Sequence, residues 1–209
     1  MPTPRPSFAC LGLAACLGVV AAGSIAAAPP ETTPLSPTPT LEAWGFDPAV
    51  LVADGIELLG RAPDRAVDGL FQAVHSAASE PGEADALCAL FESDGDRSLA
   101  GMNAAAEGLE PESRERFALA VAEVLVEATR NPPQAFDPDT ARQALKSAGA
   151  TAAILHADFL PGMQGTGEQR CRSFGMLLDA LADRPLGERA AVTRLLLHEG
   201  LSQAAASLR

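Results

Sequence analysis

The sequence predicts an all-α protein, a single compact domain of about seven or eight helices. Three observations support this prediction. Apolar residues recur at steps of three and four along most of the chain, and no window shows the sustained alternation that is typical of strands. Alanine, leucine, glutamate and arginine, which all favour helix, are abundant. Prolines and glycines divide the chain into segments of helical length.

The domain follows a segment that has the form of a secretory signal peptide. The first six residues carry one positive charge and no acid, an apolar run follows, and small residues lead to Pro29-Pro30. We expect cleavage after Ala26, because Ser24 and Ala26 supply the small side chains that the cleavage site needs. The next residues are rich in proline and threonine, which is typical of a disordered tether. The predicted organisation is a signal peptide over 1–26, a linker over 27–40 and a helical domain over 41–209.

A second interpretation of the leader involves Cys16. The residues Leu13-Ala14-Ala15-Cys16 resemble the lipobox of bacterial lipoproteins, in which the cysteine is lipidated and becomes the first residue. However, the apolar run continues past Cys16, where a lipoprotein usually becomes polar. We therefore favour export to the periplasm or secretion from a bacterium. A lipid anchor at Cys16 and an uncleaved membrane anchor are the alternatives.

The charge of the chain limits its partners. The net charge is -12, and loss of the signal peptide removes only Arg5, which makes the mature chain more acidic. This acidity argues against nucleic acid and anionic membrane surfaces as ligands. A basic envelope protein would be a suitable partner for such an acidic chain. The alternative interpretation is that the acidity only keeps an exported domain soluble. Trp44 is the only tryptophan, so aromatic platforms for sugars or bases are not expected.

Two cysteines remain after the predicted cleavage, Cys88 and Cys171. An even number of cysteines in an oxidising compartment favours a disulfide, which here would join two helices that are distant in sequence. The alternatives are two buried free thiols or a redox site. Thiol–disulfide catalysis is not expected, because the chain has no Cys-x-x-Cys motif.

The predicted helices of the first half follow from their start and stop signals. Asp47-Pro48 reads as a cap followed by proline at the first helical position, and this helix is expected to end near Gly60. A second helix begins near Pro63 and ends before Pro81. Two further helices are expected, one that carries Cys88 and one that ends at Gly108.

The strongest helical pattern runs from Pro111 to Arg130. One face carries Phe117, Val121 and Val124, and a second face carries Leu119, Ala122 and Val126. Only a narrow strip that includes Ala120 is left for solvent. A helix that is apolar over most of its circumference is expected to be central, with neighbours on two sides.

Four segments complete the prediction. A helix begins at Pro138, and Gly149 either breaks or softens it before an apolar stretch that ends at Leu160. Residues 161–167, which include the glycine-rich run Gly162 to Gly167, are expected to form a flexible loop that acts as a hinge or a partner-binding loop. Its amides could cradle an anion, but a phosphate loop is not expected, because no Gly-Lys-Ser/Thr follows and no strand precedes it. The Cys171 helix ends at Arg184-Pro185, and the last helix spans about 186–208.

The residues that could carry chemistry do not form a known motif. His198-Glu199 begins a zinc-protease pattern, but Ser202 stands where the second histidine should be. Residues 92–98 carry acidic side chains at alternate positions, as a calcium-binding loop does. However, Leu99 stands where an EF-hand needs glycine. We therefore expect no catalytic residues, no metal and no cofactor.

Two functional hypotheses remain from the sequence. The first is a non-enzymatic envelope protein that binds another protein, as an inhibitor or an adaptor does. The second is a hydrolase or metal-dependent enzyme whose site assembles only in the fold. Its candidates are the three histidines of the chain, His75, His156 and His198.

Overall fold

The computed structural model describes residues 48–91 and 104–207, and it describes side chains within 54–88 and 104–202. All regular structure in these residues is helical, which confirms the predicted all-α class. A further helical turn covers 104–107. The predicted signal peptide, the linker, Cys16 and the candidate calcium loop lie outside the described residues. The helices are α1 (Pro48–Arg61), α2 (Asp64–Ala78), α3 (Pro81–Phe91), α5 (Pro111–Arg130), α6 (Pro138–Leu155), α7 (Phe159–Met163), α8 (Gly167–Ala182) and α9 (Leu186–Ser207).

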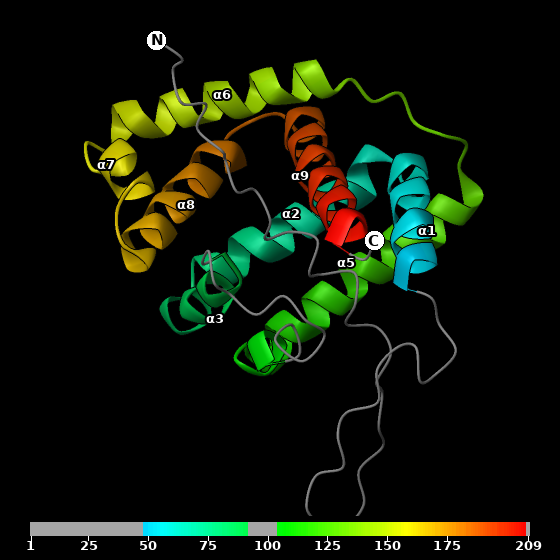
Figure 1. Ribbon diagram of the computed structural model, residues 1–209, viewed down its shortest axis with the longest axis horizontal. Coiled ribbons are helices and arrows are strands. Elements are labelled where there is room, and N and C mark those ends of the chain that lie inside the picture. Colours follow the sequence, from blue (N-terminus) through cyan, green and yellow to red (C-terminus); the bar gives the residue numbers. More distant parts are fainter. Residues whose placement is uncertain (1–47, 92–103, 208–209) are drawn as a thin grey trace, which may run out of the picture.

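Helix α2 is the central element of the domain. It contacts α9, α5, α3 and α8, while α1 lies against α5 and α9 (Figure 1). Helix α6 runs along the outside of α8 and α9. More than half of α2 is buried, including its charged residue Asp68. The hydrophobic core is therefore built around α2, and its largest fully buried side chains include Leu59, Leu70, Leu181 and Leu197.

The prediction that the Pro111–Arg130 helix is central was wrong. Phe117, Val121 and Val124 of α5 are buried as expected, but Leu119 is 63% exposed and Val126 is 45% exposed. Among the described elements, α1 and α2 make the main contacts with α5. Ala120, which was assigned to the solvent strip, is buried. Apolar residues also occur at protein surfaces, so an apolar circumference did not identify the buried face.

Two further expectations concern glycines: the structure excludes a helix break at Gly149, one of the two alternatives, and the expected loop over 161–167 was wrong in its first part. Helix α6 continues through Gly149 without a break. The expected loop after Leu160 begins as helix α7, which packs on α8. Gly162 is buried there, and the Ser173 hydroxyl of α8 donates a hydrogen bond of 3.0 Å to the carbonyl oxygen of Phe159. The α7–α8 contact therefore fixes the first part of the expected loop.

These two glycines predict opposite effects of the same substitution. A Cβ atom at Gly149 would meet nothing within 4 Å, whereas one at Gly162 would lie 2.2 Å from the Ser173 hydroxyl oxygen and 3.0 Å from the Gln169 carbonyl oxygen. We expect Gly149→Ala to raise the free energy of unfolding by about 0.5–1 kcal/mol through helix propensity. We expect Gly162→Ala to lower it by about 1–3 kcal/mol through overpacking. Urea unfolding measures both, and a stabilising Gly162→Ala would contradict the α7–α8 packing.

An ion pair between buried Asp68 and partly buried Arg189 joins α2 to α9. The Arg189 guanidinium donates two hydrogen bonds to the Asp68 carboxylate, with Nε–Oδ1 and Nη2–Oδ2 distances of 2.7 and 2.8 Å. Its remaining nitrogen donates to the carbonyl oxygens of Ala182 and Arg184 in the connection between α8 and α9. The guanidinium also lies 5.8 Å from the centre of the Phe71 ring. One arginine therefore links three parts of the fold.

Candidate functional site

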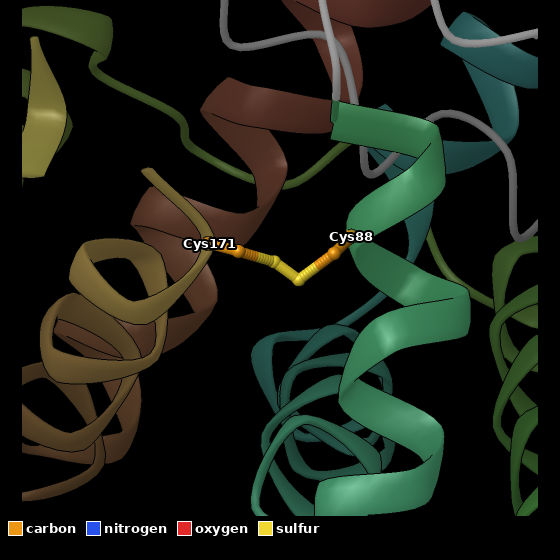
Figure 2. The surroundings of a disulfide bond; sticks show 2 residues. All are labelled: Cys88 and Cys171. Atoms are coloured by element: carbon orange, nitrogen blue, oxygen red, sulfur yellow. A yellow bond between two sulfur atoms is a disulfide. The ribbon is translucent and has the colours of Figure 1, made fainter. Parts of the chain in front are cut away.

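The structure contains the predicted disulfide. Cys88 of α3 and Cys171 of α8 are bonded, their Cα atoms are 5.6 Å apart, and 83 positions separate them in sequence (Figure 2). Both residues are half-buried. The bond adds a covalent link to the packing contact between α3 and α8. A native disulfide is typical of proteins that fold in an oxidising compartment.

A groove with a volume of about 880 Å³ lies beside this disulfide. It is formed where α3 and α8 meet the C-terminal end of α2. Its apolar lining comes from the two cysteines and from small or flexible side chains, namely Ala78, Ala84, Met176 and Leu178. Its volume lies in the range of natural ligand sites. This groove has no signal in the sequence, because its residues come from three helices and meet only in the fold.

Acidic side chains border the groove. Asp85 of α3 and Glu168 and Asp179 of α8 are exposed carboxylates among its lining residues. Arg172 lies between the two acids of α8, and its Nη2 is 3.6 Å from Glu168 Oε1. His75 Nε2 lies 2.9 Å from Asp179 Oδ1. The groove therefore combines an apolar interior with a border that contains three acidic residues, one arginine and one histidine.

The structure does not bring the three histidines together as a metal site. His75 stacks on Phe71 in α2, with ring centres 5.7 Å apart. His156 follows the end of α6, and His198 is exposed on α9. In the residues that the structure describes, no group of three histidine, cysteine or acidic side chains is placed to hold a metal ion. Of the three histidines, His75 is the one for which the described residues show a contact with a carboxylate, that of Asp179.

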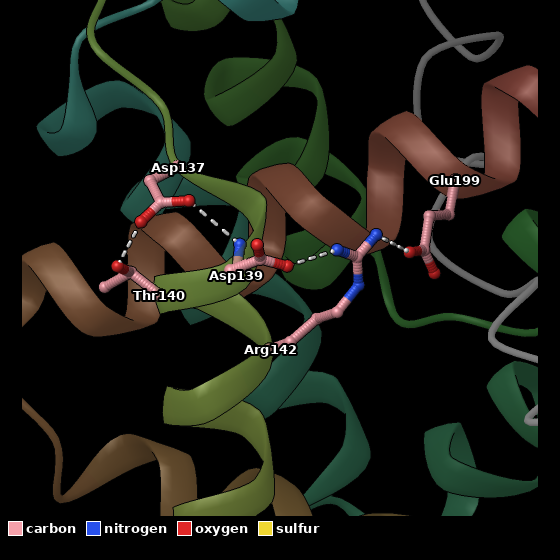
Figure 3. A network of polar contacts seen from close by, with 5 residues as sticks. All are labelled: Asp137, Asp139, Thr140, Arg142 and Glu199. Atoms are coloured by element: carbon pink, nitrogen blue, oxygen red, sulfur yellow. Dashed lines mark hydrogen bonds and ion pairs between the residues drawn. The ribbon is translucent and has the colours of Figure 1, made fainter.

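The partial zinc-protease pattern is part of a surface ion-pair network. The Glu199 carboxylate accepts a hydrogen bond of 3.3 Å from Arg142 Nη2, and Arg142 Nη1 donates to Asp139 at 3.0 Å (Figure 3). Asp137 caps the same end of α6 by accepting from the Asp139 amide and the Thr140 hydroxyl. These hydrogen bonds lower the pKa of Asp137, and the bond from the Thr140 hydroxyl has the largest effect. Asp137 therefore caps α6, and Glu199 connects α6 to α9 through Arg142.

A second, smaller hollow of about 370 Å³ lies between the starts of α2 and α6 and helix α9. Its buried Arg194 donates to the Asp64 carboxylate at 2.9 Å and to the Ala62 carbonyl oxygen at 2.7 Å. The Phe136 ring centre lies 5.9 Å from the same guanidinium. The polar groups of this hollow bind one another, so we assign it a structural role that links α9 to the α1–α2 corner.

The glycine-rich run does not present its amides as an anion cradle. The Thr166 amide donates to Gln169 Oε1 at 2.8 Å, which closes the start of α8. The Gly165 amide donates to the Gly162 carbonyl oxygen at 3.0 Å, and the Gln164 amide donates to the Pro161 carbonyl oxygen at 3.1 Å. These donors are used within the loop. The groove beside the disulfide is therefore the best candidate for a functional site.

Two further findings concern the class of the protein. Within the described ranges, no helix has the length and apolar character required to cross a membrane. Comparisons of the chain with protein-family models, with curated proteins and with solved structures found no match.

Proposed function

We propose that this protein is an exported, non-enzymatic binding module of a bacterial envelope, and that its groove docks a basic partner protein. The form of the leader supports export to the periplasm or secretion, as does a disulfide between the two cysteines that remain after cleavage. A lipid anchor at Cys16 would place the same domain at a membrane surface.

The observation that carries the proposal is the combination of lining and border in the groove. Buried apolar area supplies most of the free energy of protein association, and the groove offers such area beside the disulfide. Complementary charge around an apolar centre increases the association rate and selects the partner. Asp85, Glu168 and Asp179 supply negative charge at this border, and the whole chain has a net charge of -12. A basic partner fits both features.

Charge reversal in the groove tests this proposal. We expect Asp85→Lys/Glu168→Lys to weaken capture of basic envelope proteins by about tenfold or more, because attractive charges become repulsive ones. The matched control is Glu112→Lys/Glu115→Lys on α5, which changes the net charge by the same amount as the groove variant. The two variants also match in position, because Glu112 lies in the first turn of α5 as Glu168 lies in the first turn of α8. Each variant is immobilised and compared with the unaltered protein in envelope extract, with elution by salt.

The expected result is a set of proteins that the unaltered chain and the α5 variant retain and the groove variant loses. Circular dichroism of all three confirms that each is folded. Equal retention by the two double variants would contradict a function of the groove, because only overall charge would then matter.

A further inference from the structure

We infer that the groove accepts a single amphipathic helix of the partner, with basic residues near both of its ends. This inference rests on the proposed function and adds the form of the docking element. The argument uses the direction of the groove walls, the space between them and the spacing of the acids.

The walls of the groove are two helix faces. Its lining residues on α3 lie at positions 81, 84, 85 and 88, and the main row on α8 lies at 167, 171, 175 and 179. Positions three and four apart lie on one side of a helix, so each row runs along its helix. A groove between two helices is suited to a third helix, whose side chains fit between the ridges of the other two. A peptide that binds by adding a strand needs a sheet edge, and the described residues contain no sheet.

The space between the walls allows close approach. Gly167 and Gly175 of α8 and Ala84 of α3 line the groove with small side chains or none. A Cβ atom built on Gly175 would meet nothing within 4 Å, so the space beside this part of α8 is open. Packed helices lie about 8–10 Å apart, and small residues at the contact permit the shorter distances. The glycines of α8 therefore leave room for the apolar side chains of an incoming helix.

The acids of α8 set the charge pattern of that helix. Glu168 and Asp179 are eleven positions apart, which is about three turns and about 16 Å along the axis. Both line the groove, and Arg172 between them is directed to Glu168. Asp85 adds a negative charge on the opposite wall. A complementary helix would therefore carry lysine or arginine at two positions about eleven residues apart, with an apolar stripe between them.

A displayed library of random 16-residue peptides tests this inference on the disulfide-bonded protein. Peptides are selected on the unaltered chain and then compared on Gly175→Leu, which fills the groove, and on Gly149→Leu. The second variant is the matched control, because Gly149 is also a helical glycine whose added Cβ meets nothing, but it lies on α6 outside the groove. Charge dependence is read on Asp85→Lys/Glu168→Lys.

We expect groove-dependent peptides to bind the unaltered chain and Gly149→Leu equally and to lose about tenfold or more in affinity on Gly175→Leu. Their sequences should show an apolar period of three to four and basic residues about eleven positions apart, and a central proline should abolish binding. Groove-dependent peptides with strand-like alternation or without the paired basic residues would overturn the helix inference and leave the proposed function intact. If no selected peptide distinguishes Gly175→Leu from Gly149→Leu, the groove itself is not a docking site and both proposals fail.

Discussion

Replacing Cys88 and Cys171 by serine is expected to lower the free energy of unfolding by about 4 kcal/mol. The 83-position separation encloses a long loop, and closing such a loop in the unfolded chain removes much of its conformational entropy. The bond also holds α3 to α8 covalently. Urea unfolding at neutral pH measures the change. For a small domain whose total stability is about 5–15 kcal/mol, this loss is large.

The controls for this prediction use the fact that either substitution removes the same bond. Cys88→Ser, Cys171→Ser and the double variant should have nearly equal stabilities, and the unaltered protein in reductant should unfold close to them. Amide exchange of α3 should accelerate most, because the bond joins α3 directly to α8. Within residues 81–88, its other anchors include buried Leu87 and Glu83, which accepts hydrogen bonds from the Glu110 amide and the Ser113 hydroxyl. A double variant within about 0.5 kcal/mol of the unaltered protein would contradict a stabilising bond.

Arg189→Met is expected to lower the free energy of unfolding by about 3–5 kcal/mol. The substitution leaves the buried Asp68 carboxylate without its two charge-assisted hydrogen bonds. It also removes the donor that holds the Ala182 and Arg184 carbonyl oxygens. The hydrogen bonds to Asp68 raise the pKa of Arg189 above its ordinary range. Its stabilisation is therefore present throughout the neutral range and is lost only as the pH rises through that raised pKa.

Two variants distinguish this pair from an ordinary surface contact. Arg142→Met removes the exposed pairs with Asp139 and Glu199 and should cost at most about 1 kcal/mol. Asp68→Ala/Arg189→Met removes both charges and should recover part of the loss caused by Arg189→Met alone. Urea unfolding of these variants would contradict the assignment if Arg189→Met were no more damaging than Arg142→Met.

The sequence predicted the helix starts better than the packing of the helices. Proline at the first position marks α1, α5 and α6, and each begins where proline predicts it. This signal is local and needs no tertiary information. The disulfide could also be predicted, because the expected cleavage after Ala26 would leave only two cysteines to pair.

The central helix could not be identified in the same way. Helix α2 is buried through small residues such as Ala66, Ala73 and Ala77 and through Asp68, whose burial depends on Arg189 from 121 positions away. The larger buried residues of α2, among them Val67 and Leu70, form one apolar stripe that the sequence shows. Alanine is compatible with either core or surface, so the sequence does not show that further faces of α2 are buried as well. The groove depends in the same way on how three helices meet. Neither feature has a local signal in the sequence.

The glycines show the same limit. Gly149 lies within a helix that its neighbours stabilise, and Gly162 lies where α7 approaches Ser173 of α8. A glycine-rich composition is compatible with a flexible loop and with close packing of two helices. Only the position of the second helix decides between these structures.

The central claim is that the domain is exported and that its two remaining cysteines join outside the reducing cytosol. Its most direct test is the intact mass of the protein recovered from the cells that make it, after treatment with an alkylating reagent under native conditions without reductant. We predict a chain that begins at Ala27, carries no alkyl group and lacks the two hydrogens lost in the Cys88–Cys171 bond. A chain that begins at lipidated Cys16 with the same bond would change the anchoring but retain the claim. A full-length chain with alkyl groups on both Cys88 and Cys171 would contradict it.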